Sequence, residues 1–203
     1  MNNTNERESG DSIGQNFWND LWQKNETGWD IGQASPAITL YMTQYMDKNS
    51  AILIPGCGNA HEAEYLVETG FTNITLLDIA PKAVEKLQEK FSNKPQVKIL
   101  CEDFFEHQGN YDLIIEQTFF CAIPPIKRDE YAKKMASILN PGGKIIGVLF
   151  NKNFNQPLPP FGGSPGVYDS IFKPYFSIKT MEECYNSIPA RSQSEVFIIF
   201  LRK

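Results

Sequence analysis

The chain has 203 residues, of which 41% are hydrophobic and 21% charged, and these values are ordinary for a soluble globular domain with a sizeable core. Its net charge of −5 argues against a nucleic-acid backbone as partner, because no basic stripe is available to replace counterions. No apolar run reaches the length of a membrane span, and the polar first 16 residues resemble no secretory signal, so we expect a cytoplasmic protein without a membrane partner.

Helix and strand patterns alternate along most of the chain. Residues 1–15 are polar and lack an apolar period, which predicts a disordered tail before a single domain over residues 16–203. Periodicity and turn residues predict helices over 17–22, 37–46, 61–69, 81–91 and 128–139, and strands over 51–54, 74–78, 97–101, 111–115, 144–150, 177–185 and 195–202. A loop rich in proline and glycine over 151–166 has the length of a functional lid.

The order of these elements predicts an α/β fold. Five alternations of strand and helix indicate a doubly wound, mostly parallel sheet. The last two strands have no helix between them, so they must form an antiparallel hairpin at the sheet edge. Seven strands ending in such a hairpin favour the Rossmann-like class I methyltransferase fold over a nicotinamide dehydrogenase.

A glycine turn follows the first predicted strand. Gly56, Cys57 and Gly58 let the backbone turn tightly and approach a ligand closely. Asp78 lies 22 residues after Gly56, at the end of the next strand, where its carboxylate can accept hydrogen bonds from both ribose hydroxyls. This unit predicts an adenosine-containing cofactor.

The charges at the strand ends indicate which cofactor this is. The rim formed by Asp78-Ile79, Asp103-Phe104 and Glu116-Gln117 holds three acids and neither lysine nor arginine. A pyrophosphate would be repelled there, and His61 stands where a dinucleotide fingerprint needs its third glycine. S-adenosylmethionine carries a sulfonium, an ammonium group and no phosphate, so it suits this rim. Acids also cap turns without binding anything, and for Asp103 this alternative stays open.

Three tryptophans precede the first strand. Trp18 and Trp22 share a helix face at spacing i, i+4, and Trp29 follows in the next loop. Aromatic faces attract cations by roughly 0.5–2 kcal/mol, so an aromatic lid over a sulfonium is one interpretation. The other is that these rings only fasten the helix to the core.

Several segments in order resemble a known family, namely 17–22 with 28–30, 54–58, 112–123 and 158–161. Together they resemble the thiopurine S-methyltransferase superfamily over residues 17–203, and most of all its halide/thiol methyltransferase branch. The resemblance implies an N-terminal aromatic lid over S-adenosylmethionine.

The resemblance also implies roles for single residues. It implies that Asp78 binds the ribose, that Asp103 and Phe104 contact the adenine, and that Phe161 lines the acceptor pocket. We expect Phe17 and Gln117 to line that pocket as well. Two positions depart from the family pattern: Gln117 stands where arginine or tyrosine is frequent, and Phe161 where tyrosine is frequent.

The chemistry implied is in-line methyl transfer to a halide, thiocyanate, hydrosulfide or thiol, which needs alignment and exclusion of water. No metal site and no acid–base residue is expected: the four cysteines are too dispersed for a zinc knuckle, His61 begins a helix, and His107 is expected on the solvated surface. Alternatives are an oxygen, nitrogen or metalloid acceptor, a non-catalytic S-adenosylmethionine-binding protein, and a nicotinamide oxidoreductase. We expect a monomer whose partner is a small-molecule acceptor.

Overall fold

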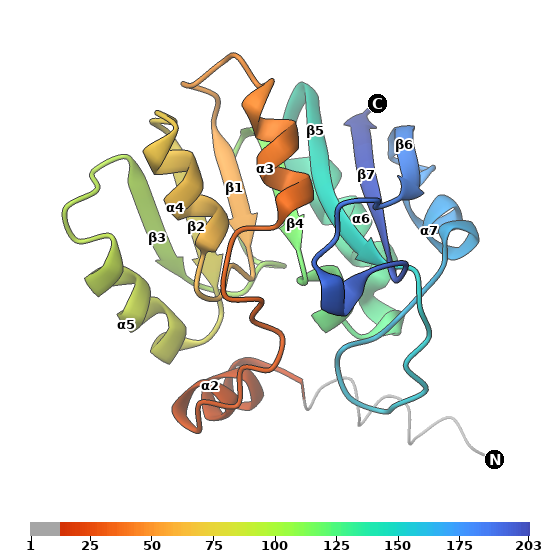
Figure 1. Ribbon diagram of the computed structural model, residues 1–203, viewed down its shortest axis with the longest axis horizontal. Helices are drawn as coiled ribbons and strands as arrows, with labels where there is room; N and C mark the ends of the chain where they lie inside the picture. Colours follow the sequence, from red (N-terminus) through yellow and green to blue (C-terminus); the bar gives the residue numbers. More distant parts are fainter. Residues whose placement is uncertain (1–12) are drawn as a thin grey trace.

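The computed structural model describes residues 13–203, which form a layered α/β fold (Figure 1). Seven strands form one sheet in the order β3-β2-β1-β4-β5-β7-β6. The strands are β1 (Ile52–Pro55), β2 (Ile74–Asp78), β3 (Val97–Cys101), β4 (Tyr111–Gln117), β5 (Leu139–Phe150), β6 (Phe176–Glu183) and β7 (Glu195–Arg202). The first five strands are parallel, and β7 pairs antiparallel with both β5 and β6.

Helices cover both faces of the sheet. One face carries α3 (Pro36–Thr43), α4 (His61–Glu68) and α5 (Pro81–Lys90), and the opposite face carries α6 (Arg128–Ile138) and α7 (Pro165–Phe172). Three short 3-10 turns, η1 (Phe120–Ala122), η2 (Pro125–Lys127) and η3 (Pro189–Arg191), lie in the connections. The first described helix, α2 (Gln15–Gln23), lies beyond the carboxyl ends of the parallel strands (Figure 1).

The continuous apolar runs of the central strands divide between two cores. All four residues of β1 are buried, with Ile52 and Ile54 packed toward α3 and α4, and Leu53 toward α6. This alternation follows from the two-residue period of a strand, and it explains why these strands show no polar face.

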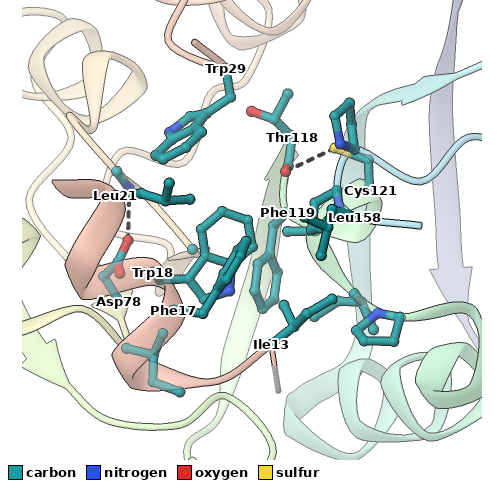
Figure 2. A pocket seen from close by; sticks show the side chains of 18 of the residues that line it. Ile13, Phe17, Trp18, Leu21, Trp29, Asp78, Thr118, Phe119, Cys121 and Leu158 are labelled. Atoms are coloured by element: carbon teal, nitrogen blue, oxygen red, sulfur yellow. Dashed lines mark hydrogen bonds between the residues drawn. The ribbon is translucent and has the colours of Figure 1, made fainter. Parts of the chain in front are cut away.

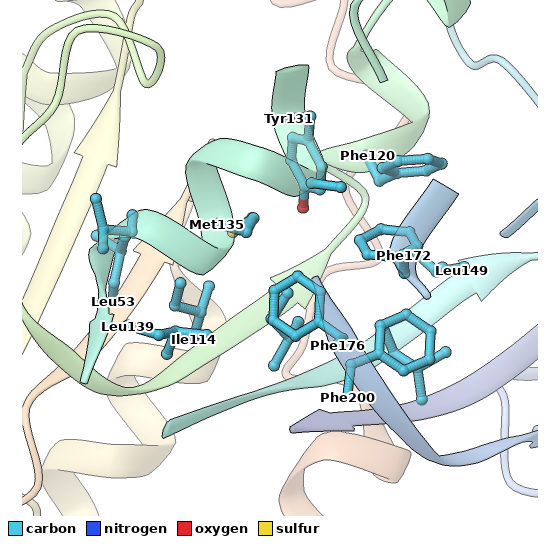
Figure 3. Close-up of a cluster of buried hydrophobic side chains, with 14 of the residues drawn as sticks. Leu53, Ile114, Phe120, Tyr131, Met135, Leu139, Leu149, Phe172, Phe176 and Phe200 are labelled. Carbon is cyan, nitrogen blue, oxygen red and sulfur yellow. The ribbon is translucent and has the colours of Figure 1, made fainter. Parts of the chain in front are cut away.

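The larger core is rich in aromatic rings (Figure 3). Tyr131 and Met135 of α6 and Phe172 of α7 cover Phe176 of β6 and Phe200 of β7. The rings of Phe172 and Phe200 lie 4.8 Å apart between centroids. This packing fixes the antiparallel strands against the parallel part of the sheet.

The fold prediction is confirmed, including the antiparallel hairpin of the last two strands. Helix α7 is not among the predicted elements, because the proline- and glycine-rich composition up to Gly166 predicts a loop there. In the structure Pro165 begins α7, a position where its missing N–H costs nothing. Most of the predicted tail, residues 1–15, lies outside the described residues, and Gln15 already belongs to α2.

Helix α2 is fastened to the loop after β2 and to the start of α5 by polar contacts as well as by packing. The Asn19 side-chain oxygen accepts a hydrogen bond from the Lys82 backbone N–H at 2.9 Å, and the Gln15 amide donates to the Ile79 carbonyl at 3.1 Å. No helix among residues 13–203 is long and apolar enough to span a membrane.

Candidate functional site

A cavity of about 880 Å³ opens at the carboxyl ends of the parallel strands, between the sheet and α2 (Figure 2). Its walls come from segments distant in the sequence. They are the lid segment (residues 15–32), the glycine turn after β1, the ends of β2 and β3, the turn after β4, the loop after β5, and η3. This is the place where open α/β sheets bind their ligands.

The glycine turn forms the floor of the cavity. Gly56 and Gly58 have φ of +56° and +52°, in the left-handed region that favours glycine. A Cβ on Gly56 would lie 2.2 Å from Cδ2 of Phe119, so the ring packs directly on the backbone of the turn. Cys57 lies in the same turn, but its side chain does not line the cavity.

Asp78 sits beside this turn at the end of β2 and is only 8% exposed. Its two carboxylate oxygens accept backbone N–H bonds from Gly58 at 3.0 Å and Ala80 at 2.9 Å. Burial raises the pKa of Asp78, and these backbone bonds oppose the rise. A carboxylate has about four acceptor sites, so about two remain for hydroxyl groups of a ligand in the cavity.

The three tryptophans are expected either to cover the cofactor or to fasten the helix to the core, and the structure shows both kinds of contact. Trp22 is buried and packs against Ala80 and Ala83 at the start of α5, as a core residue does. Trp18 and Trp29 are partly buried, and their rings meet edge to face at 5.4 Å. All three line the cavity, and the indoles of Trp18 and Trp29 are seen at its wall in Figure 2.

The end of β3 contributes a mixed polar and aromatic wall. Phe104 is buried, and its ring meets that of Phe119 edge to face at 5.2 Å. Asp103 lines the cavity and also caps its own turn, because its Oδ1 accepts the Phe105 backbone N–H at 2.8 Å. Ile79 and Phe17 line the cavity as well.

Glu116, by contrast, lies behind the cavity wall and is 1% exposed. Its Oε1 accepts backbone N–H bonds from Phe119 and Phe120, both at 2.8 Å, and its Oε2 accepts the hydroxyl of Tyr131. Burial raises the pKa of Glu116 to about 7. Because Glu116 accepts these three hydrogen bonds, it fixes the turn that carries Thr118 and Phe119 into the cavity.

Gln117 and Phe161 also lie outside the lining of the cavity. The side-chain oxygen of Gln117 is buried without a hydrogen-bond partner among the described residues. Phe161 is held by its backbone: its N–H donates to the Cys121 carbonyl at 2.7 Å, and its carbonyl accepts from Arg128 at 3.2 Å. The loop after β5 reaches the cavity through Leu158, Pro159 and Pro160 instead.

Three cations line the cavity that the strand-end pattern did not include, namely Lys127, Lys152 and Arg191. They come from η2, the loop after β5 and η3, whereas the acids that line the cavity are Glu26, Asp78, Glu102 and Asp103. The sheet order places the ends of β2 and β3, with Asp78, Glu102 and Asp103, on one side, and the end of β5 and the start of β7, with Lys152 and Arg191, on the other. Lys127 belongs to the first side, since its ammonium lies 5.3 Å from the centroid of the Phe105 ring, just after β3. We call these two sides the acidic half and the basic half of the cavity.

Neither histidine reaches the cavity. His61 begins α4, and its Nε2 lies 2.9 Å from Oδ1 of Asp30. The expectation of a solvated His107 is wrong: its ring is 3% exposed, with Nε2 2.8 Å from the Tyr111 hydroxyl and Nδ1 bonded to Glu102. Within residues 13–203 no group of acids, histidines and cysteines has the arrangement of a metal site.

Comparison with solved structures identifies the fold class. The chain superposes with a TM-score of 0.76 on 1,6-didemethyltoxoflavin-N1-methyltransferase from Burkholderia thailandensis, at 12% identity over 95% of this chain and 88% of that one. It superposes with a TM-score of 0.73 on magnesium protoporphyrin IX methyltransferase from Synechocystis, at 15% identity over 93% and 95%. The fold is thus that of the class I methyltransferases.

Sequence comparison then gives the family. The thiopurine S-methyltransferase family model matches residues 13–198. A probable thiol methyltransferase 2 from Arabidopsis thaliana is 33% identical, over 77% of this chain and 71% of its own length. Thiocyanate methyltransferase 1 from Brassica oleracea is 29% identical over 91% and 84%. The chain belongs to the thiopurine S-methyltransferase family and is an S-adenosylmethionine-dependent methyltransferase.

Proposed function

We propose that the protein transfers a methyl group from S-adenosylmethionine to a small anionic or sulfur nucleophile, such as thiocyanate, a halide, hydrosulfide or a thiolate. The observation that carries this proposal is the division of charge within the cavity. A cation-bearing cofactor suits the acidic half, and an anionic acceptor suits the basic half, where Lys152 and Arg191 face the same space as the ring of Phe150.

The residues of the acidic half fit the cofactor. Asp78 retains about two acceptor sites for the ribose hydroxyls. Phe104 and Ile79 offer apolar surface to the adenine, beside the polar side chain of Asp103. Trp18 and Trp29 offer ring faces that attract a sulfonium. Cys57, Glu116 and Gln117 would support this site from behind the wall, without touching the ligand.

When bound, the cofactor would supply a methyl group on a sulfonium: the acceptor would bond to the methyl carbon as the carbon–sulfur bond breaks in line, and the neutral thioether would leave with the electron pair. The chain's own contribution is to align the acceptor, to exclude water and to balance charge. The lid segment and the loop after β5 cover the cavity with apolar rings from Phe17, Trp18 and Phe154. Water removed from an anionic nucleophile makes that nucleophile more reactive.

Cys121 is a competing nucleophile inside the same cavity, and the structure keeps it unreactive. Its thiol donates a hydrogen bond to the Thr118 carbonyl at 3.1 Å. Burial raises the pKa of Cys121 to about 12, so the thiol stays protonated at neutral pH. Only the thiolate is a strong nucleophile, so the methyl group is reserved for the acceptor.

The names of the relatives agree with this proposal, since the similar plant proteins are called thiol and thiocyanate methyltransferases. An oxygen, nitrogen or metalloid acceptor is the second candidate, and a protein that binds the cofactor without turnover is the third. A nicotinamide oxidoreductase is set aside by the family match.

The test has two stages. Calorimetric titration with S-adenosylmethionine should show saturable binding, and headspace mass spectrometry with thiocyanate, iodide and hydrosulfide should show volatile methylated products. Lys152→Gln should lower kcat/KM for thiocyanate and weaken its dependence on salt, because a charge that steers the anion is lost. Lys144→Gln is the matched control, since Lys144 lies outside the cavity, against the rings of Tyr41 and Tyr45. Binding without turnover of any anionic acceptor would refute the proposal.

A further inference from the structure

Arg191 joins parts of the site that are far apart in the sequence. It ends η3, between β6 and β7, and its side chain is 12% exposed at the cavity wall. Nη2 donates to the carbonyl of Trp29 at 2.8 Å, and Nη1 donates to Oε1 of Glu195 at 3.2 Å. The guanidinium carbon lies 5.1 Å from the centroid of the Phe150 ring.

The partner carboxylate of Arg191 is itself fixed. Glu195 is 4% exposed, and its other oxygen accepts the Ser187 hydroxyl at 2.7 Å. A guanidinium has five N–H donors, of which these contacts use two. Because Arg191 lines the basic half, donors remain available to an anion bound there.

The lid segment has a second anchor at Asp30, the residue after Trp29. Oδ1 of Asp30 accepts the Gly32 backbone N–H at 2.8 Å and lies 2.9 Å from Nε2 of His61. Oδ2 of Asp30 accepts the side-chain amide of Asn59. This anchor ties the lid segment to the start of α4, beside the glycine turn, and none of its polar groups lines the cavity.

We propose that Arg191 is a positioning residue that couples the lid segment to the acceptor, so that cofactor and anionic acceptor strengthen each other's binding. This inference rests on the proposed function, because it takes the acceptor to be an anion in the basic half. A bound anion would fix the guanidinium, and the guanidinium would fix the backbone of Trp29 over the cofactor.

The coupling follows from one shared group. An anion that accepts the remaining N–H donors of Arg191 holds the guanidinium in the position from which it donates to the Trp29 carbonyl, so each ligand favours the arrangement that the other one needs. Linkage requires that the effect be reciprocal, and typical couplings change affinity by roughly 5- to 150-fold. The Asp30 anchor orders the lid segment without touching the basic half, so it should affect cofactor binding alone.

The experiment measures the Kd of S-adenosylhomocysteine by calorimetry with and without saturating thiocyanate. S-adenosylhomocysteine carries no transferable methyl group, so no turnover disturbs the equilibrium. In the wild type, thiocyanate should tighten binding by roughly fivefold or more. In the double variant Arg191→Gln/Glu195→Gln the ratio of the two Kd values should fall to about one. The double variant removes both buried charges and avoids leaving Glu195 unpaired.

Asp30→Asn is the matched control: it should weaken S-adenosylhomocysteine binding and keep the wild-type ratio. Circular dichroism and thermal melting establish that each variant is folded. The coupling would be overturned if the Kd of S-adenosylhomocysteine in the wild type were the same with and without thiocyanate. It would also be overturned if the folded double variant kept the wild-type ratio of these two Kd values. Turnover of thiocyanate is measured separately on the wild type, so turnover with a ratio of one would refute the coupling and leave the proposed function standing.

Discussion

The buried carboxyl of Glu116 should make the stability of the protein depend on pH. Its pKa rises from an ordinary 4.5 to about 7 in the folded chain, because burial disfavours the charged form. The folded state therefore holds a proton that the unfolded state releases near pH 4.5. This contribution is fully present below pH 4.5 and is lost as the pH rises through about 7. A shift of about 2.5 units corresponds to about 3 kcal/mol at 1.36 kcal/mol per unit.

Glu116→Gln should remove this dependence. The amide oxygen can accept the Phe119 and Phe120 N–H bonds, and the amide nitrogen can donate to Tyr131, so the turn after β4 is kept. Urea denaturation at pH 5 and pH 8 gives the free energy of unfolding for both proteins. The wild type should lose roughly 2–3 kcal/mol more than the variant over this interval, less than the full shift because pH 5 already lies above the ordinary pKa. Glu106→Gln, at an exposed position, is the control. Equal losses in the wild type and Glu116→Gln would show that this carboxyl is already ionised at pH 5.

Three further changes test the cofactor site and the core. Asp78→Ala should weaken S-adenosylmethionine binding by roughly 10- to 150-fold in calorimetry, because charge-assisted hydrogen bonds are lost, and an unchanged Kd in folded protein would mean the ribose lies elsewhere. Gly56→Ala should cost at least about 1–2 kcal/mol of stability from its positive φ, with a further clash against Phe119, whereas Gly166→Ala, with open space around it, should melt like the wild type. Phe172→Ala should cost roughly 3–5 kcal/mol in urea denaturation, since its ring is fully buried between α6 and β7, and a loss under 1 kcal/mol would show that the core can collapse around the gap.

Local rules were sufficient to predict most of the fold. The buried run Ile52–Pro55, the turn at Gly56 and Gly58, and the acid at position 78 follow the strand–turn–helix logic of an open sheet. The hairpin followed from a simple fact, the absence of a helix pattern between residues 185 and 195. Each of these inferences depends on residues that are neighbours in the sequence.

The cavity wall was harder to predict, because it depends on how loops return over the sheet. The position of Glu116 near a strand end predicts a place at the rim, but β4 continues through Gln117, and the Glu116 carboxylate is buried behind the cavity wall. Arg191 is distant in the sequence from the ends of β1 to β4 that mark the site. Its hydrogen bond to the Trp29 carbonyl joins residues 162 positions apart, so no local pattern predicts it. Likewise His107 stands in a polar stretch, and only the approach of Tyr111 and Glu102 explains its burial.

The position of β7 has a consequence for the order in which the protein can be completed during synthesis. Strand β6 leaves the ribosome before β7, yet within residues 13–203 its one sheet partner is β7, which also pairs with β5. Until β7 emerges, β5 presents an open edge and β6 has nowhere to dock, a state prone to mispairing. Arg191 lies on the connection between these strands. A nascent chain can therefore hold the glycine turn and Asp78 in place while the basic half of the cavity is still incomplete.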